Sequence, residues 1–231
     1  HGTIDTITYE QSYEGTTYTK QAYVYVPASY STSNPANVLY LTHGWWGNAA
    51  GLANGVAPVV DELETAGTAA PTLVVFATYY PDRSFATDDY EDDYALNRFF
   101  ATSEIDTLID TIESRYTTFA RGDTSDESLR ASRRHRAFGG FSMGATTTWD
   151  VFTLRPQYFY GFMPMAGESW IGREEEADSP RIAELVTAGV ERAQYGPQDF
   201  RILASVGSED PALWDMTPQI DELREDYPDL M

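Results

Sequence analysis

A serine lies in the run Gly140-Phe141-Ser142-Met143-Gly144, directly after an apolar segment and directly before a segment with helical spacing. In G-x-S-x-G sequences placed between a strand and a helix, the serine occupies a sharp turn that lifts its hydroxyl above the sheet. The sequence therefore predicts a nucleophilic serine, with the N–H of the next residue directed at a developing oxyanion. A glycine-rich turn at a strand end is the alternative interpretation, and the flanking segments favour the nucleophile.

A second oxyanion donor is expected from a loop that follows an earlier strand. The sequence HGWWGN at positions 43–48 comes directly after the apolar segment 38–42. We therefore predict that the backbone N–H of Trp45 is the second donor. His43 is predicted to hydrogen-bond this loop from below, because it precedes the loop and lies at the wrong end of the site to act as a base.

The acid of a serine triad should follow a later strand, and acidic residues follow the segment 201–206. Asp210 is the predicted acid, because the order serine, acid, histidine along the chain is the one expected for this motif. Glu209 and Asp215 are rivals for the role. The alternative interpretation is an ordinary acidic loop in an acidic protein.

The segments around these motifs predict an α/β fold. Strands are expected at 3–10, 17–27, 38–42, 72–78, 136–141, 162–166 and 201–206, and helices at 56–65, 99–116, 144–154, 180–192 and 217–225. The first two strands should form a hairpin with its turn near Glu14-Gly15. After that hairpin, strand and helix alternate, which predicts a mostly parallel sheet with helices on both faces. Residues 1–231 are expected to form a single domain.

Composition excludes several classes of function. The chain has 231 residues, no cysteine and a formal net charge of −21. A surface this acidic disfavours nucleic acid and anionic membranes as partners, and no apolar run is long enough for a membrane helix. Without cysteine there is no disulfide, thiolate zinc site or cysteine nucleophile. Lys20 is the only lysine among the basic residues, and we interpret this scarcity as a bias of lineage or habitat and not as a site.

The segment 87–94 carries five carboxylates. Oxygen-rich clusters suit calcium, but the spacing is not that of an EF-hand, and such runs are usually solvated loops. We expect no metal here, and calcium binding remains an alternative. A mobile flap over the cleft is a further possibility, since the segment follows a strand at the catalytic end of the sheet.

Together these blocks resemble the esterase D-like branch of the α/β-hydrolases, and within it the feruloyl and acetylxylan esterases of carbohydrate esterase family 1. The resemblance runs from about residue 1 to residue 220. It is carried by VLYLTHG at 38–44, RAFGGFSMG at 136–144, FMPMAG at 162–167 with Ser169-Trp170, and GSED at 207–210 followed by Met216 and Gln219-Ile220.

The resemblance implies roles for individual residues. By position it makes Ser142 the nucleophile, Asp210 the triad acid, and the N–H groups of Trp45 and Met143 the oxyanion donors. It also places Trp170 in the wall of the acyl pocket. Three further aromatic residues are expected to line the cleft and to stack on a phenolic acyl group or a sugar, namely Trp46, Tyr79 and Tyr80. Ordinary packing in the core or at the rim is the alternative interpretation for each aromatic residue, Trp170 included. The implied partner is an acylated plant polysaccharide or oligosaccharide, without a cofactor, and the implied location is extracellular.

The sequence departs from this family after Asp210. There the family has another strand, a glycine-rich loop with the catalytic histidine, and a last helix. This chain has three histidines, His1, His43 and His135, and none is suitably placed. We therefore expect the C-terminal strand and helix to be absent, the fold to be incomplete at one edge, and the chain to be nearly inactive. A shortened chain is the favoured explanation, because strand 201–206 would otherwise be an uncovered edge.

Three functional hypotheses remain open. The leading one is a serine carboxylic ester hydrolase that removes feruloyl or acetyl groups from xylan through an acyl-enzyme. The second is an acyltransferase of the same fold, which would pass the acyl group to a sugar hydroxyl. The third is a degenerate homologue that binds carbohydrate and has lost the base.

Overall fold

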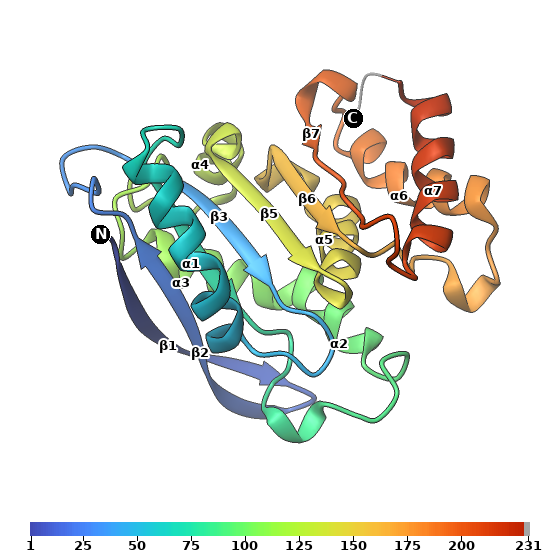
Figure 1. Ribbon diagram of the computed structural model, residues 1–231, viewed down its shortest axis with the longest axis horizontal. Helices are drawn as coiled ribbons and strands as arrows, with labels where there is room; N and C mark the ends of the chain where they lie inside the picture. Colours follow the sequence, from blue (N-terminus) through green and yellow to red (C-terminus); the bar gives the residue numbers. More distant parts are fainter. Residues whose placement is uncertain (229–231) are drawn as a thin grey trace.

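The computed structural model describes residues 1–228, which form a sheet of seven strands with helices on both faces (Figure 1). The strands are β1 (Thr3–Tyr13), β2 (Thr16–Val26), β3 (Asn37–Thr42), β4 (Thr72–Ala77), β5 (Arg136–Phe141), β6 (Gly161–Met165) and β7 (Arg201–Ile202). Their order across the sheet is β1-β2-β4-β3-β5-β6-β7. β1 and β2 are antiparallel to their neighbours, and all the other pairings are parallel. The predicted mostly parallel sheet is therefore confirmed.

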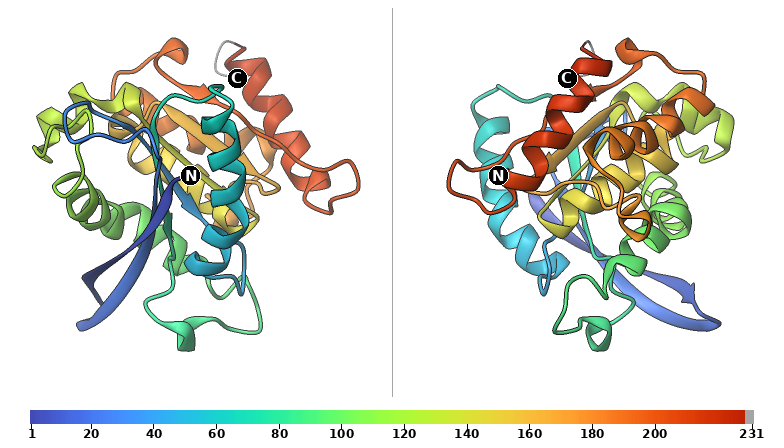
Figure 2. Two further views of the ribbon diagram at one scale, coloured as in Figure 1. Left: turned by 60° about the vertical axis from the view of Figure 1, so that its left-hand side comes forward. Right: turned by 90° about the vertical axis from the view of Figure 1, so that its right-hand side faces the viewer.

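The helices are divided between the two faces of the sheet. They are α1 (Ala49–Thr65), α2 (Tyr94–Phe99), α3 (Ile105–Glu113), α4 (Asp126–Ala131), α5 (Met143–Leu154), α6 (Ser179–Arg192) and α7 (Leu213–Asp226). α1 packs on one face against β2 and β4, with its own buried cluster. α3, α5, α6 and α7 contribute to the larger cluster on the other face (Figure 2). These two clusters confirm the prediction that helices cover both faces of the sheet.

The opening hairpin explains how the sheet begins. Glu14 and Gly15 have positive φ angles of 48° and 81°, the left-handed pair that a two-residue type I′ turn requires. The turn lies where the sequence predicted it. Along β1, Ile7 and Tyr9 are buried between exposed neighbours, so one face of the hairpin packs on the core and the other meets solvent.

Helix α1 begins earlier than predicted. The sequence placed its start at residue 56, whereas the structure starts it at Ala49. The Asn48 side chain accepts a hydrogen bond from the backbone N–H of Gly51 at 2.8 Å and so caps the helix. Gly51 and Gly55 weaken the helical signal of this first part, which explains why the pattern alone missed it.

The helix predicted at 99–116 is interrupted by a π turn at Phe100–Glu104, between α2 and α3. Glu104 is buried there, forms an ion pair with Lys20 and accepts a hydrogen bond from the Tyr9 hydroxyl at 2.6 Å. Lys20 also donates to the carbonyl oxygen of Thr78. This lone lysine therefore has a structural role that the sequence did not indicate, because it joins β2 to the helical layer inside the core.

Strand β7 is shorter than predicted, and Pro164 supplies the reason. The sequence predicted a strand over 201–206, whereas the regular pairing with β6 covers Arg201 and Ile202. Backbone hydrogen bonds continue from Leu203 to Phe162 and from Ser205 to Pro164. The intervening bond cannot form, because Pro164 has no N–H to donate. The loop after β7 still leaves from the same end of the sheet as the loops after β3, β5 and β6 (Figure 1).

Candidate active site

Ser142 lies between β5 and α5 in a strained backbone conformation. Its φ and ψ angles are 56° and −115°, a region that non-glycine residues rarely occupy. A Cβ atom at Gly140 would lie 2.3 Å from the carbonyl oxygen of Gly144, and a Cβ at Gly144 would lie equally close to that of Thr42. The two glycines therefore allow the helix to start directly against the strands. The predicted sharp turn is present, and the nucleophilic role of Ser142 remains a prediction.

Two backbone N–H groups lie beside Ser142 and have no acceptor among the residues that the structure describes. Met143 is the first residue of α5, and Trp45 follows β3 at the same end of the sheet. The loop with Trp45 is close to the serine, since a Cβ at Gly44 would lie 3.3 Å from the Ser142 Cβ. Within residues 1–228, no hydrogen bond engages either N–H. The partial positive charge of the α5 N-terminus would further stabilise an oxyanion bound by these two N–H groups.

Asp210 lies in the same cleft as Ser142. This cleft, of about 380 Å³, is formed by the loops that follow β3, β5, β6 and β7. One Asp210 carboxylate oxygen accepts a hydrogen bond from the backbone N–H of Ala212 at 2.9 Å, which orients the side chain. Glu209 is exposed and does not line the cleft, whereas Asp215 lines it. The geometry thus favours Asp210 over Glu209 and leaves Asp215 as a rival.

His43 is buried beneath the oxyanion loop and holds it in place. Its Nδ1 is 2.7 Å from the carbonyl oxygen of Gly44, and its Nε2 is 2.7 Å from the Thr78 hydroxyl. Burial lowers the pKa of His43 to about 4, so the ring is neutral at physiological pH. Nδ1–H therefore donates to the carbonyl, and Nε2 accepts from the hydroxyl. This is the structural role that the sequence predicted for His43.

The other two histidines also lie away from Ser142. His135 is at the opposite end of β5, where it contacts Asn37 at 2.9 Å and stacks on Phe119. His1 pairs with Asp61 beside α1. In the part of the chain that the structure describes, no hydrogen bond joins a histidine to the Ser142 hydroxyl. The prediction that none of the three lies within reach of this hydroxyl is therefore confirmed.

Aromatic rings form one wall of the cleft. The ring of Tyr90 lies 5.8 Å from that of Trp45 and 5.5 Å from that of Trp170, and all three residues line the cleft. The Trp170 indole N–H donates to Glu168 at 2.6 Å, which fixes its orientation. Sequence analysis missed Tyr90, although it gave a flap over the cleft as one possible role for the segment 87–94. A tyrosine within that acidic run was the signal that could have identified it.

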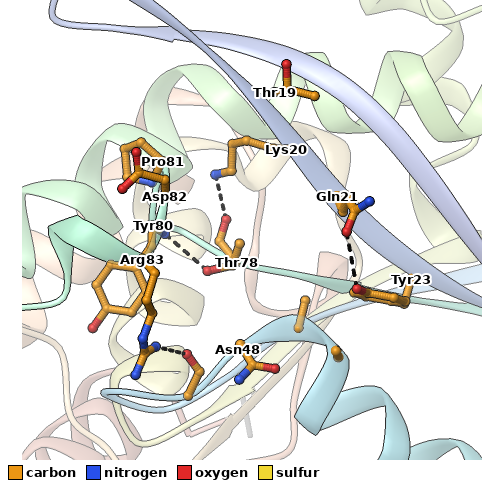
Figure 3. Close-up of a pocket in the computed structure, with 13 residues that line it drawn as sticks. Thr19, Lys20, Gln21, Tyr23, Asn48, Thr78, Tyr80, Pro81, Asp82 and Arg83 are labelled. Carbon is orange, nitrogen blue, oxygen red and sulfur yellow. Dashed lines mark hydrogen bonds between the residues drawn. The ribbon is translucent and has the colours of Figure 1, made fainter.

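The predictions for Tyr79 and Tyr80 are corrected by the structure. Tyr79 is fully buried and Tyr80 is 3% exposed, and both pack against His43 beneath the oxyanion loop. The Tyr80 hydroxyl donates to the buried carboxylate of Asp93. Figure 3 shows Tyr80 in a separate pocket, of about 410 Å³, on the β2 side of this loop. Neither ring lines the cleft with Ser142, because both side chains turn into the core.

Trp46 also lies outside the cleft. Its indole N–H donates to the carbonyl oxygen of Thr87, and the Arg83 guanidinium lies 4.7 Å from its ring centroid. Arg83 also donates to the carbonyl oxygens of Trp46 and Gly47 at 2.7 and 2.8 Å, and Figure 3 shows this side chain reaching the loop. Arg83 thus holds the loop in which Trp46 has a positive φ of 59°. Trp46 therefore does not line the cleft with Ser142, and its contact with substrate stays a prediction.

Comparisons with known proteins agree with this architecture. A feruloyl esterase module from Clostridium thermocellum, solved as a serine-to-alanine mutant complexed with sinapinate, matches with a TM-score of 0.80 and 29% identity over 96% of this chain and 73% of that one. The chain has the feruloyl esterase fold. The resemblance predicted from the sequence is therefore confirmed. No protein-family model matches the chain.

Two curated relatives match most of this chain in sequence. Endo-1,4-beta-xylanase Y of Acetivibrio thermocellus is 30% identical over 93% of this chain and 19% of its own length. An endo-1,4-beta-xylanase/feruloyl esterase of Xylanibacter ruminicola is 26% identical over 82% of this chain and 24% of its own length. The chain thus spans about a fifth to a quarter of the curated relatives it matches.

The esterase fold shows no metal cluster and no membrane helix in the residues described. Among residues 1–228, no three histidine, aspartate or glutamate side chains are grouped so that they could hold a metal ion. In the acidic loop, Asp93 accepts hydrogen bonds from Thr87 and Tyr80. No helix within these residues is both long and apolar enough to span a bilayer. Calcium binding by the loop remains an untested alternative.

Asp150 on α5 predicts how the stability of the esterase fold depends on pH. The carboxyl is fully buried, and one oxygen accepts from the Tyr94 hydroxyl at 2.9 Å. Burial raises the pKa of Asp150 to about 7, so between pH 4 and 7 the folded state binds a proton that the unfolded state releases. The free energy of unfolding should therefore fall by about 4 kcal/mol as pH rises through this range. Asp150→Asn should abolish this component, measured by urea denaturation at pH 4.5 and pH 8.

A matched control separates this effect from general charge repulsion. Asp88→Asn removes one exposed carboxylate and should leave the pH dependence as in the wild type. The titration of His43 is common to all three proteins and cancels in the comparison. Equal pH dependence in Asp150→Asn and the wild type would contradict the assignment.

Proposed function

We propose that the chain is the esterase domain of a serine carboxylic ester hydrolase that releases feruloyl or acetyl groups from xylan. One observation carries this proposal. Ser142 sits on a strained strand-to-helix turn, inside a cleft with Asp210 and beside the free N–H groups of Trp45 and Met143. This combination suits covalent acyl transfer, because it presents a nucleophile, an oxyanion site and a carboxylate at one sheet edge.

The reaction follows from the roles of these groups. The Ser142 oxygen attacks the ester carbonyl as its proton passes to a base, and the N–H groups of Trp45 and Met143 hold the oxyanion. The bond to the sugar oxygen then breaks, and the base returns the proton to that oxygen. Water, deprotonated by the same base, attacks the acyl-enzyme and releases the free acid. Asp210 would orient the base and stabilise its protonated form.

The base must be a group other than the three histidines of this chain. His43 is neutral and fully engaged, and His1 and His135 lie elsewhere in the fold. We propose that a histidine from outside these 231 residues completes the site. The 231-residue chain alone should therefore be nearly inactive, because an unassisted serine hydroxyl is a poor nucleophile at neutral pH.

The proposed substrate is a phenolic or acetyl ester on a plant polysaccharide. The wall formed by Trp45, Tyr90 and Trp170 suits a flat aromatic acyl group. Sinapinate, a phenolic acid, is the compound bound to the feruloyl esterase module that resembles this chain. A polymeric substrate of this kind is met outside the cell, so the proposal includes secretion.

A comparison of three esters tests the proposal. Methyl ferulate, acetylated xylan and a long-chain nitrophenyl ester are assayed with the wild-type chain, with imidazole added as the base. We expect methyl ferulate or acetylated xylan to be cleaved fastest, because the rings of Trp45, Tyr90 and Trp170 border the cleft. Fastest cleavage of the long-chain ester would contradict the proposed substrate class.

A further inference from the structure

A second cavity, of about 570 Å³, lies directly beyond Trp170. It is formed by the loop after β6, the start of α6 and the first turns of α7, which lie together beyond β6 in Figure 1. Four residues line both this cavity and the cleft that contains Ser142, namely Tyr90, Glu168, Trp170 and Asp215. A ligand longer than one acyl group could therefore occupy both spaces at once.

Trp214 lines this cavity with an indole ring that is open to solvent. It lies in the first turn of α7 and is 81% exposed, more than any other large apolar side chain in residues 1–228. The helix that carries it is held in the core by Met216 and Leu223, so the ring projects from a fixed backbone. A large flat apolar ring on a rigid support is suited to the apolar face of a sugar, as exposed aromatic patches generally mark binding surfaces.

An unpaired polar group lies in the wall of the same cavity. Gln219 is buried, and its side-chain oxygen accepts a hydrogen bond from the Ser169 N–H at 2.8 Å. Its Nε2 group has no hydrogen-bond partner among the described residues. A buried donor without an acceptor is costly, and Gln219 is one of the residues that line the cavity. This group points to a ligand that carries hydroxyl groups.

The charges around the cavity favour a neutral ligand. Glu168, Glu176, Asp178 and Asp215 all line it, against a single basic residue, Arg173. Arg173 is already paired with Glu91 and lies 4.3 Å from the Trp170 ring. The excess of carboxylates can accept hydrogen bonds from sugar hydroxyls and should repel acidic sugars.

We propose that this second cavity is a subsite for neutral sugar units of the polysaccharide chain that bears the ester, with Trp214 as the stacking platform. The identity of the sugar chain rests on the proposed function, whereas the binding itself requires no chemistry at Ser142. The subsite would seat the polysaccharide beyond Trp170 while the ester carbonyl occupies the cleft.

Calorimetric titration with xylohexaose, which carries no ester, tests the subsite. The wild-type chain should bind it, and Trp214→Ala should weaken binding by about tenfold or more. Leu203→Ala is the matched control, since Leu203 is 66% exposed and lies outside the cavity, and it should bind as the wild type does. Circular dichroism should show all three proteins equally folded, because both replaced side chains are on the surface.

Two results would overturn the subsite. One is the absence of xylohexaose binding to the wild type, and the other is unchanged binding by Trp214→Ala. A xylo-oligosaccharide substituted with glucuronic acid should bind more weakly than xylohexaose, and tighter binding would contradict the charge argument. Xylohexaose carries no ester, so Ser142→Ala should bind it as tightly as the wild type does. Xylohexaose binding therefore tests the subsite separately from the esterase proposal, which is tested by ester hydrolysis.

Discussion

Ser142→Ala is expected to abolish all ester hydrolysis that an added base restores. In a complete serine triad, loss of the nucleophile costs about 10⁶ in kcat. Free imidazole supplies the missing proton acceptor without the advantage of positioning, so we expect it to raise hydrolysis of an aryl ferulate by about 10²-fold in the wild-type chain. The Ser142→Ala chain should gain nothing beyond the reaction of imidazole in buffer.

Without imidazole, the wild type and Ser142→Ala should hydrolyse the aryl ferulate at nearly the same low rate. Triad members act as a unit, so a chain that lacks its base has already lost most of the benefit of the serine. The control is imidazole in buffer without protein. Equal gains in the wild type and in Ser142→Ala would show that the serine is not the nucleophile. No gain in either would favour the carbohydrate-binding homologue over the esterase.

Asp210→Asn is expected to remove the increase in the rate of ester hydrolysis that added imidazole produces. In serine proteases the corresponding change costs about 10⁴ in kcat, because the imidazole loses its oriented tautomer and its stabilising charge. A gain of about 10²-fold should therefore vanish. Rates of aryl ferulate hydrolysis at several imidazole concentrations measure this effect directly.

Two further variants test whether the right carboxylate is chosen. Glu209→Gln should keep the full gain, because Glu209 is exposed and does not line the cleft. Asp215→Asn should keep most of it, although Asp215 borders the cleft. If Asp215→Asn or Glu209→Gln loses the gain while Asp210→Asn retains it, the acid has been assigned to the wrong residue.

The backbone of the candidate site could be predicted because local sequence determines it. Strand β5 and the start of α5 were placed within a residue, since a short apolar run, two glycines and a helical pattern leave few alternatives. The loop after β3 was placed for the same reason. In parallel sheets, loops that follow strands meet at one edge, so Ser142, Trp45 and Asp210 were expected to lie together.

Side-chain directions were predicted less well, because they depend on packing between distant segments. Tyr79 and Tyr80 follow β4 at the correct end of the sheet, but both turn inward against His43. Lys20 gave no local signal, because its partner Glu104 is 84 residues away in the chain and lies in a π turn that the helical pattern hid. Trp214 went unnoticed because a single tryptophan in a polar helix has no periodic pattern.

Peptide mapping after reaction with an aryl fluorophosphonate tests most directly whether Ser142 is the nucleophile. The reagent forms a stable adduct with an activated serine, so the outcome does not depend on how fast an acyl-enzyme is hydrolysed. With imidazole present, the wild-type chain should carry one adduct, on the peptide that contains Ser142, and Ser142→Ala should carry none. An adduct on another residue, equal labelling of the two proteins, or no labelling of the wild type would contradict the account.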